Sequence, residues 1–162
     1  MSEGNILIVD DEETMCNLLK DILAEKGYEV TTTQKAREAL ELAQDRPFDL
    51  IITDLKMPEI DGIEMVRQIK EFGIDSIVLV ITAYPSVESV RDVLGLGAYD
   101  YITKPFNLEE MFFTVKRAVE FHQLNVTNKK LIEKLEKQNI LLEGKKRKAE
   151  KDIGKDEGGN RG

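Results

Sequence analysis

The chain has 162 residues, 41% of them hydrophobic and 33% charged, with a formal net charge of −8, which is the composition of a soluble globular protein. No stretch approaches the ~20 consecutive apolar residues of a membrane span, and the N-terminus has no basic start, so we expect a cytoplasmic protein without membrane contact. Cys16 is the only cysteine, which excludes an internal disulfide and a cysteine-based metal site.

Charge divides the chain into two parts. Residues 1–122 carry 12 basic and 24 acidic side chains, whereas residues 123–162 carry 11 basic and 7 acidic ones. An acidic domain does not favour nucleic acid, but clustered carboxylates suit a hard cation. We therefore predict a domain over residues 1–122 that does not bind nucleic acid directly, followed by an extension of different character.

Within residues 1–122, short runs predicted to be strands alternate with stretches in which apolar residues recur at helical spacing. Apolar runs predict strands at residues 5–9, 50–52 and 77–81, and we expect a short, more exposed strand at 28–32 and a short last strand at 99–103. Apolar residues at helical spacing predict helices around residues 15–23, 36–43, 63–69 and 87–94. Strict alternation with fully apolar strands predicts an α/β fold, with a doubly wound five-stranded parallel sheet covered on both faces.

From Leu108 onward, apolar residues again recur at helical spacing, and no Pro or Gly interrupts the chain between residues 106 and 143. We therefore expect one extended C-terminal helix that leaves the domain. Beyond the domain, apolar and polar residues recur at alternating steps of three and four, which predicts a coiled-coil extension over residues 123–143. This heptad seam consists of Phe121, Leu124, Asn128, Leu131, Leu135, Gln138 and Leu142. Residues 144–162 are nearly devoid of apolar side chains, and we expect a disordered tail there.

Four of the predicted strands end in polar side chains. These are Asp10 with Asp11, then Asp54, Thr82 and Lys104. The carboxyl ends of parallel strands share one edge of the sheet, where ligands bind in open α/β folds. Three carboxylates within ~5 Å repel by roughly 3 kcal/mol per pair at an effective dielectric of about 20, which one lysine does not offset. A divalent cation is therefore expected, and the oxygen-only ligand set favours Mg²⁺.

The same arrangement suits phosphoryl transfer. Asp54 would attack in line as the nucleophile to form an aspartyl phosphate, while Lys104 and the Thr82 hydroxyl hold phosphoryl oxygens. Each feature taken alone has an ordinary structural explanation, because aspartates cap helices and Lys-Pro forms turns. The four together at one edge favour the chemical interpretation.

These residues also resemble a known family, the CheY-like receiver domain of two-component response regulators. The resemblance covers about residues 4–122 and rests on VDDE at residues 9–12, TDLKMPEIDG at 53–62, ITA at 81–83 and DYITKPF at 100–106. It implies the flavodoxin-like receiver fold, Mg²⁺ as cofactor, a sensor histidine kinase as partner, and a cis peptide bond before Pro105. The implied roles are phosphoacceptor for Asp54, metal-binding acids for Asp10 and Asp11, a metal-binding backbone carbonyl for Lys56, switch residues for Thr82 and Tyr101, and phosphate sensing for Lys104.

The resemblance further implies a phosphoacceptor rather than an enzyme. Loss of the phosphoryl group should be slow, because we expect no dedicated general base nearby, and Lys56 and Tyr84, which flank the site, are the candidates for setting its rate. The output surface would comprise residues 87–94, 99–103 and 108–119. The heptad seam predicts a parallel homodimer, in which Asn128 favours two strands. The extension is similar to the linkers of AAA+ transcription-activator receivers, so the chain is either a stand-alone receiver or a piece of a longer transcription regulator.

Rival interpretations fit the sequence less well. A haloacid-dehalogenase-type phosphatase needs a second aspartate two residues after the nucleophile, where this chain has Lys56. A flavin-binding flavodoxin cradles phosphate on its first loop, where the acidic run 10–13 would repel it.

His122 is expected to be a partly exposed surface residue rather than a phosphohistidine relay. The basic run 145–148 lacks aromatic neighbours and is expected to be a solvated tail.

Overall fold

The computed structural model describes the backbone of residues 2–159 and the side chains of residues 2–153. The strands are β1 (Asn5–Val9), β2 (Glu29–Thr33), β3 (Leu50–Asp54), β4 (Ile77–Thr82) and β5 (Asp100–Thr103). The helices are α1 (Glu13–Glu25), α2 (Ala36–Asp45), α3 (Gly62–Glu71), α4 (Val87–Gly95) and α5 (Leu108–Gly159). The predicted alternation of strands and helices is confirmed.

The five strands form one parallel sheet in the order β2-β1-β3-β4-β5. The chain therefore winds outward in one direction through β2 and in the other through β4 and β5, which confirms the doubly wound topology. In such sheets the direction of winding reverses between two central strands, here β1 and β3, and the crevice outside their carboxyl ends is the usual ligand site. Asp54 ends β3 and pairs with Ile81 of β4, so it lies at this crevice.

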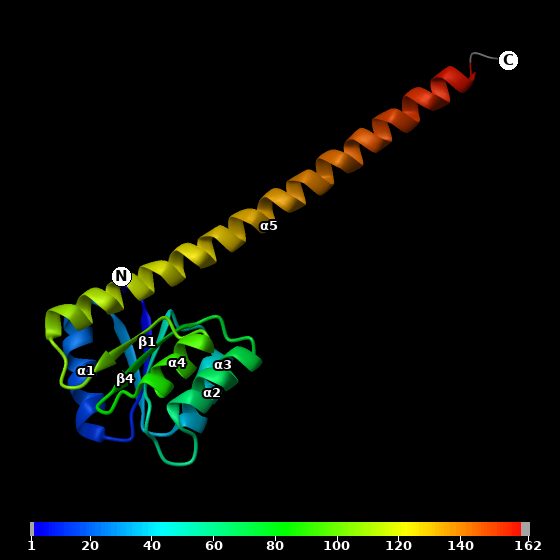
Figure 1. Cartoon of the computed structure of the whole chain (residues 1–162). Coiled ribbons are helices and arrows are strands. Elements are labelled where there is room, and N and C mark those ends of the chain that lie inside the picture. The colour runs from blue at the N-terminus through cyan, green and yellow to red at the C-terminus, as the bar shows by residue number, and fades with distance from the viewer. Residues whose placement is uncertain (1, 160–162) are drawn as a thin grey trace. The chain divides into compact units, whose positions relative to one another are not determined.

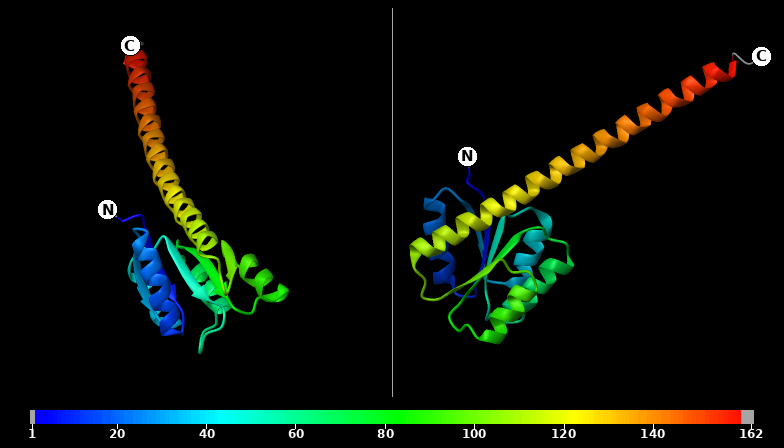
Figure 2. Two further views of the ribbon diagram at one scale, coloured as in Figure 1. Left: turned by 90° about the vertical axis from the view of Figure 1, so that its left-hand side faces the viewer. Right: turned by 45° about the horizontal axis from the view of Figure 1, so that its top comes forward.

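Side chains of successive strand residues point to opposite faces of the sheet, and each face has its own apolar core. Ile6 and Ile8 of β1 pack in the core covered by α1 and the first turns of α5, whereas Leu7 and Val9 pack in the core beneath α2 and α3. The ribbon views show helices on both faces (Figure 1; Figure 2). Burial on both faces explains why the three central strands, β1, β3 and β4, are nearly uninterrupted apolar runs, whereas the edge strands β2 and β5 are more polar.

The turn after β3 is held close to the start of α3. Asp61 caps α3 by accepting a 2.8 Å hydrogen bond from the backbone N–H of Glu64. Gly62 opens the helix, and a Cβ at that position would lie 2.5 Å from the carbonyl oxygen of Asp54 and 2.6 Å from Cα of Leu55. Any side chain at Gly62 would therefore displace the backbone that carries Asp54.

The chain divides into two compact units, residues 1–123 and 124–162, one residue from the boundary that the charge pattern predicts. The structure continues α5 to Gly159, which differs from the expected disordered tail over residues 144–159; residues 160–162 lie outside the described part. Lysine, arginine, glutamate and alanine, which fill residues 145–151, are strong helix formers even without an apolar face, and this explains the difference. No helix in the described part of the chain is long and apolar enough to cross a membrane.

Candidate functional site

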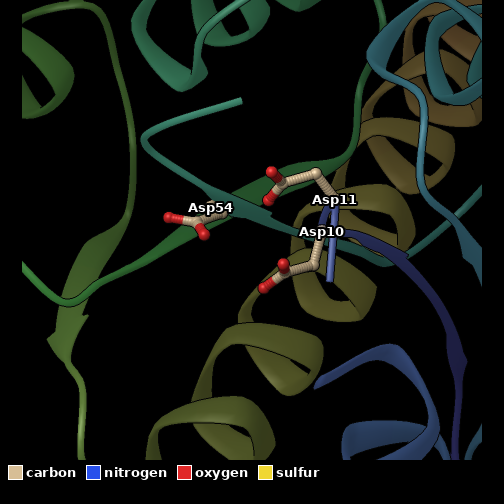
Figure 3. Close-up of side chains that lie close together, drawn as sticks. All are labelled: Asp10, Asp11 and Asp54. Carbon is tan, nitrogen blue, oxygen red and sulfur yellow. The ribbon is translucent and has the colours of Figure 1, made fainter. Parts of the chain in front are cut away.

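Three carboxylates gather at the carboxyl edge of the sheet (Figure 3). Asp10 and Asp11 follow β1 and Asp54 ends β3, and each offers one oxygen in a group whose members lie within 4.8 Å of one another. Asp10 is only 3% exposed, Asp54 is half-buried, and Asp11 is exposed. The structure thus brings together the three acids that the sequence places at strand ends.

Lys104 joins this group from the end of β5. Its Nζ donates hydrogen bonds to Oδ2 of Asp10 at 3.0 Å and to Oδ2 of Asp54 at 3.1 Å. The lysine side chain is 12% exposed, and the side chains of its two partners are 4% and 11% exposed. The peptide bond from Lys104 to Pro105 is cis, as expected. One ammonium group therefore lies between two largely buried carboxylates, and Asp11 leaves the cluster with a net negative charge.

Burial and hydrogen bonding shift the proton affinities in this cluster. Burial raises the pKa of Asp10 above its usual 3.8, although the backbone N–H of Glu12 and the ammonium of Lys104 partly offset this. Burial lowers the pKa of Lys104, but its bonds to Asp10 and Asp54 outweigh that effect, so the pKa lies above 10.5. Because the folded state raises the pKa of Asp10, this carboxylate favours folding less as the pH rises through that pKa.

The wall of the site contains a hydroxyl and an aromatic ring. Thr82 ends β4 and is 2% exposed, and its Oγ1 accepts a 3.2 Å hydrogen bond from the backbone N–H of Tyr84. The backbone N–H of Lys56 donates to Oδ1 of Asp54 at 3.4 Å. The Nζ of Lys56 lies 4.7 Å from the centroid of the Tyr84 ring, within range of a cation–π interaction. Lys56 and Tyr84 thus contact each other beside the acidic cluster.

Tyr101 lies on β5 and is 36% exposed. It lines an open groove of about 450 Å³ together with residues of the α4 region, namely Pro85, Ser86, Val87, Val90 and Arg91. A groove bordered by a strand and a helix places this aromatic side chain on the predicted output surface rather than in the acidic cluster.

The expectation that His122 is a partly exposed surface residue is wrong, because the residue is only 6% exposed. His122 follows Val115, Ala118 and Val119 at helical spacing, and those three residues pack in the sheet core. Its Nδ1 lies 2.9 Å from Oδ1 of Asp49, just before β3. The apolar stripe of α5 was therefore the sequence signal that this histidine faces inward.

A comparison with family models matches residues 6–116 to the response regulator receiver domain. The chain belongs to this family. Among curated relatives, this receiver is 36% identical over 121 residues to the transcriptional regulatory protein ZraR of Klebsiella oxytoca, covering 75% of this chain and 27% of that protein. It is also 36% identical over 121 residues to the regulatory protein AtoC of Escherichia coli strain K12, covering 75% and 26%. The receiver thus spans about a quarter of the length of these relatives.

Solved structures share the receiver fold. The beryllofluoride-activated NtrC4 receiver domain dimer is 38% identical, with a TM-score of 0.69, covering 73% of this chain and 98% of that chain. A CheY-like receiver domain from Methanospirillum hungatei JF-1 is 30% identical, with a TM-score of 0.72, covering 75% and 98%. Both matches extend over nearly the whole of the solved chains, which confirms the receiver fold.

Proposed function

We propose that this receiver accepts a phosphoryl group on Asp54 from a sensor histidine kinase, in a Mg²⁺-dependent reaction. The observation that carries the proposal is the ammonium of Lys104 held 3.0–3.1 Å from Asp10 and Asp54, at the edge where a buried hydroxyl also ends β4. A carboxylate flanked by a fixed cation and a hydroxyl is suited to attack phosphorus, because both groups stabilise charge on phosphoryl oxygens.

In this reaction an oxygen of Asp54 forms a bond to phosphorus while the bond from phosphorus to the imidazole nitrogen of the kinase breaks, and the electron pair of that bond leaves with the nitrogen. The ammonium of Lys104 and the hydroxyl of Thr82 bind the phosphoryl oxygens. Asp10, Asp11, Asp54 and the backbone carbonyl of Lys56 would hold the Mg²⁺, which fits the all-oxygen donor set at this edge. When bound, Mg²⁺ supplies positive charge that offsets the carboxylates and the incoming phosphoryl group.

The test is incubation of the full chain with acetyl phosphate and Mg²⁺, followed by intact mass measurement. Wild type should gain one phosphoryl group, and Asp54→Ala should gain none. Asp21→Ala, which removes an exposed carboxylate on α1, is the matched control and should behave as wild type. Equal phosphorylation of the Asp54→Ala protein would overturn the proposal.

Phosphorylation would switch the receiver between two states through Thr82 and Tyr101. Thr82 would move toward the phosphoryl oxygens and leave space that Tyr101 fills by turning inward. We expect beryllofluoride with Mg²⁺ to shift amide resonances over residues 87–94, 99–103 and 108–119 in wild type, and to shift them much less in Thr82→Ala. Nuclear magnetic resonance measures this, and full-size shifts on that surface in the variant would contradict the switch.

Phosphoryl loss should be slow, because among the residues that the structure describes no dedicated general base contacts Asp54. The contact between Lys56 and Tyr84 would hinder the approach of water. Tyr84→Ala removes a contact worth about 0.5–1 kcal/mol and should therefore speed dephosphorylation by about two- to fivefold. Tyr84→Phe keeps the ring and should hydrolyse at the wild-type rate. Loss of the phosphoprotein mass with time measures both rates, and equal rates for the two variants would contradict this role.

A homodimer through α5 is the second part of the proposal. The leucines of the heptad seam at 124, 131, 135 and 142 are each 52–63% exposed. Burying one such side chain is worth ~1.5–3 kcal/mol, so a parallel pair of these helices gains enough to offset the cost of association. Asn128 in the seam favours two strands in fixed register. The related NtrC4 structure is described as a receiver dimer.

Charges in the seam should abolish the dimer. The double change Leu131→Glu and Leu135→Glu places four like charges between the paired helices, so light scattering at micromolar concentration should give the monomer mass. Glu133→Lys, on the outer face of the heptad, is the control and should leave the dimer intact. A dimer that survives in residues 1–123 alone would show that the seam is not the interface.

We further propose that the receiver serves a transcription regulator, since relatives that it matches are transcriptional regulatory proteins. In this role the chain acts in the cytoplasm as a phosphoacceptor that changes its protein contacts, rather than as an enzyme, and the extension beyond residue 123 serves as a dimerising linker. The mass of the full-length gene product tests this most simply. A product that ends at residue 162 would favour a stand-alone receiver acting through protein contacts.

A further inference from the structure

Thr53 immediately precedes Asp54 on β3, and none of the roles assigned above uses its hydroxyl. The residue is 0% exposed. Its partners on the neighbouring strands, Val9 of β1 and Val80 of β4, both pack in the apolar core beneath α2 and α3. A hydroxyl in an apolar core is unfavourable unless it has a hydrogen-bond partner, so the partner of this hydroxyl indicates what the threonine does.

The partner is the backbone of the next residue. Oγ1 of Thr53 donates a 3.0 Å hydrogen bond to the carbonyl oxygen of Asp54, and Sδ of Met57 lies 3.9 Å from the same hydroxyl. A hydroxyl has one proton and a thioether sulfur is a weak acceptor, so the carbonyl receives the stronger bond. Because that oxygen lies in the plane of the peptide bond from Asp54 to Leu55, the hydroxyl fixes the orientation of this plane.

The start of α3 confines the same stretch of backbone. Gly62 packs so closely that a Cβ there would lie 2.5 Å from the carbonyl oxygen of Asp54. The backbone N–H of Gly62 also donates to the carbonyl of Leu55 at 2.8 Å. Two successive carbonyls are thus held, one by Thr53 and the next by Gly62. The chain leads from them to Lys56, whose backbone N–H donates to Oδ1 of Asp54 at 3.4 Å.

We propose that Thr53 is a positioning residue for the phosphorylation site, whose hydroxyl sets the path of the backbone from Asp54 to Lys56. This inference rests on the function proposed above, in which the carboxylate of Asp54 and the backbone carbonyl of Lys56 both hold Mg²⁺. The carbonyl that Thr53 bonds is neither of these ligands, so the residue acts through the intervening peptide plane. A fixed plane keeps the two ligand oxygens in one relative orientation, and less ordering is then needed when the ion binds.

Three substitutions separate the hydroxyl from the shape of the side chain. Thr53→Val has nearly the same shape without the hydroxyl, whereas Thr53→Ser keeps the hydroxyl and lacks the methyl group. Thr53→Ala differs from Thr53→Ser only by the missing oxygen. A threonine that served only to fill the core would tolerate valine better than serine, because deletion of a buried methyl group leaves a cavity. A positioning hydroxyl predicts the reverse order.

Isothermal titration calorimetry of the full chain with Mg²⁺ alone measures the effect without a phosphodonor. We expect Thr53→Ser to bind Mg²⁺ within about twofold of the wild-type affinity, and Thr53→Val and Thr53→Ala to bind it about tenfold more weakly. The rate of phosphorylation by acetyl phosphate at subsaturating Mg²⁺, followed by intact mass, should show the same order.

Thr114→Val is the matched control. Thr114 lies on α5 and is 8% exposed, and its Oγ1 donates a 2.9 Å hydrogen bond to the carbonyl of Glu110. The change therefore removes a comparable buried hydroxyl from another element, and it should leave the Mg²⁺ affinity unchanged.

Equal Mg²⁺ affinities of Thr53→Ser and Thr53→Ala would overturn the positioning role, even if Thr53→Val fails to fold. An affinity of Thr53→Val equal to that of wild type would overturn it as well. A different result contradicts the function proposed above, namely a wild type that binds Mg²⁺ but gains no phosphoryl group from acetyl phosphate. A wild type that binds no Mg²⁺ would contradict both.

Discussion

Replacing Lys104 with methionine should destabilise the metal-free protein by about 2–3 kcal/mol at neutral pH. Its ammonium is the group that lies between the carboxylates of Asp10 and Asp54, whose side chains are 4% and 11% exposed. Removing one partner of a buried ion pair costs about 3–5 kcal/mol, and the partial exposure of this site reduces the expected loss. Because the remaining carboxylates can be protonated, the difference from wild type should shrink as the pH falls toward the range where they titrate.

The same change should slow phosphorylation by acetyl phosphate about a hundredfold, because the lost ammonium would no longer stabilise charge on the phosphoryl oxygens. Urea unfolding at several pH values measures the first effect, and intact mass against time measures the second. Lys20→Met, an exposed lysine on α1, is the matched control and should change neither quantity. A Lys104→Met protein as stable as wild type at pH 7 would contradict the structural role of this pair.

Removing Mg²⁺ with a chelator should lower the phosphorylation rate at least a hundredfold, since three acids would then repel the phosphodonor. Mg²⁺ alone should also stabilise the fold, by about 2.7 kcal/mol at a concentration one hundred times its Kd. The cluster is net negative and Asp10 is buried with its pKa raised, so a cation relieves an unfavourable charge. Thermal unfolding with and without Mg²⁺ measures the stabilisation.

Asp11→Asn provides the critical comparison. Asp11 is exposed, so this change should leave the metal-free protein folded, yet it removes one of the three carboxylates from the group. We expect the variant to lose most of the Mg²⁺-dependent stabilisation and to be phosphorylated slowly. Equal stabilisation of variant and wild type by Mg²⁺ would show that the ion binds elsewhere.

The fold and the grouping of the site residues could be predicted from the sequence, because both depend on patterns within short stretches of the chain. Apolar runs that end in acids predict buried strands, and parallel strands necessarily bring their carboxyl ends to one edge. Asp10, Asp54 and Lys104 are 44 or more residues apart in sequence, yet their positions at strand ends suffice to place them together. The detailed contacts, such as the ammonium between two specific oxygens, depend on side-chain packing that no spacing rule provides.

The environment of His122 shows where local reasoning fails. The histidine is polar and lies on the long C-terminal helix, so a partly exposed surface position was the expectation. The histidine continues the buried stripe of α5 and contacts Asp49, 73 residues earlier in the chain, a pairing that no motif marks. The helix beyond residue 143 is a different case, because strong helix formers there favour a helix that no apolar pattern predicts.

The most direct measurement locates the phosphoryl group on the chain. The phosphorylated protein is reduced with borohydride, which converts an acyl phosphate to a stable alcohol, then digested and sequenced by mass spectrometry. The modification should appear at residue 54 in the presence of Mg²⁺ and should be absent after chelation. Reduction at another carboxylate, with residue 54 unmodified, would contradict the assignment of Asp54 as the phosphoacceptor.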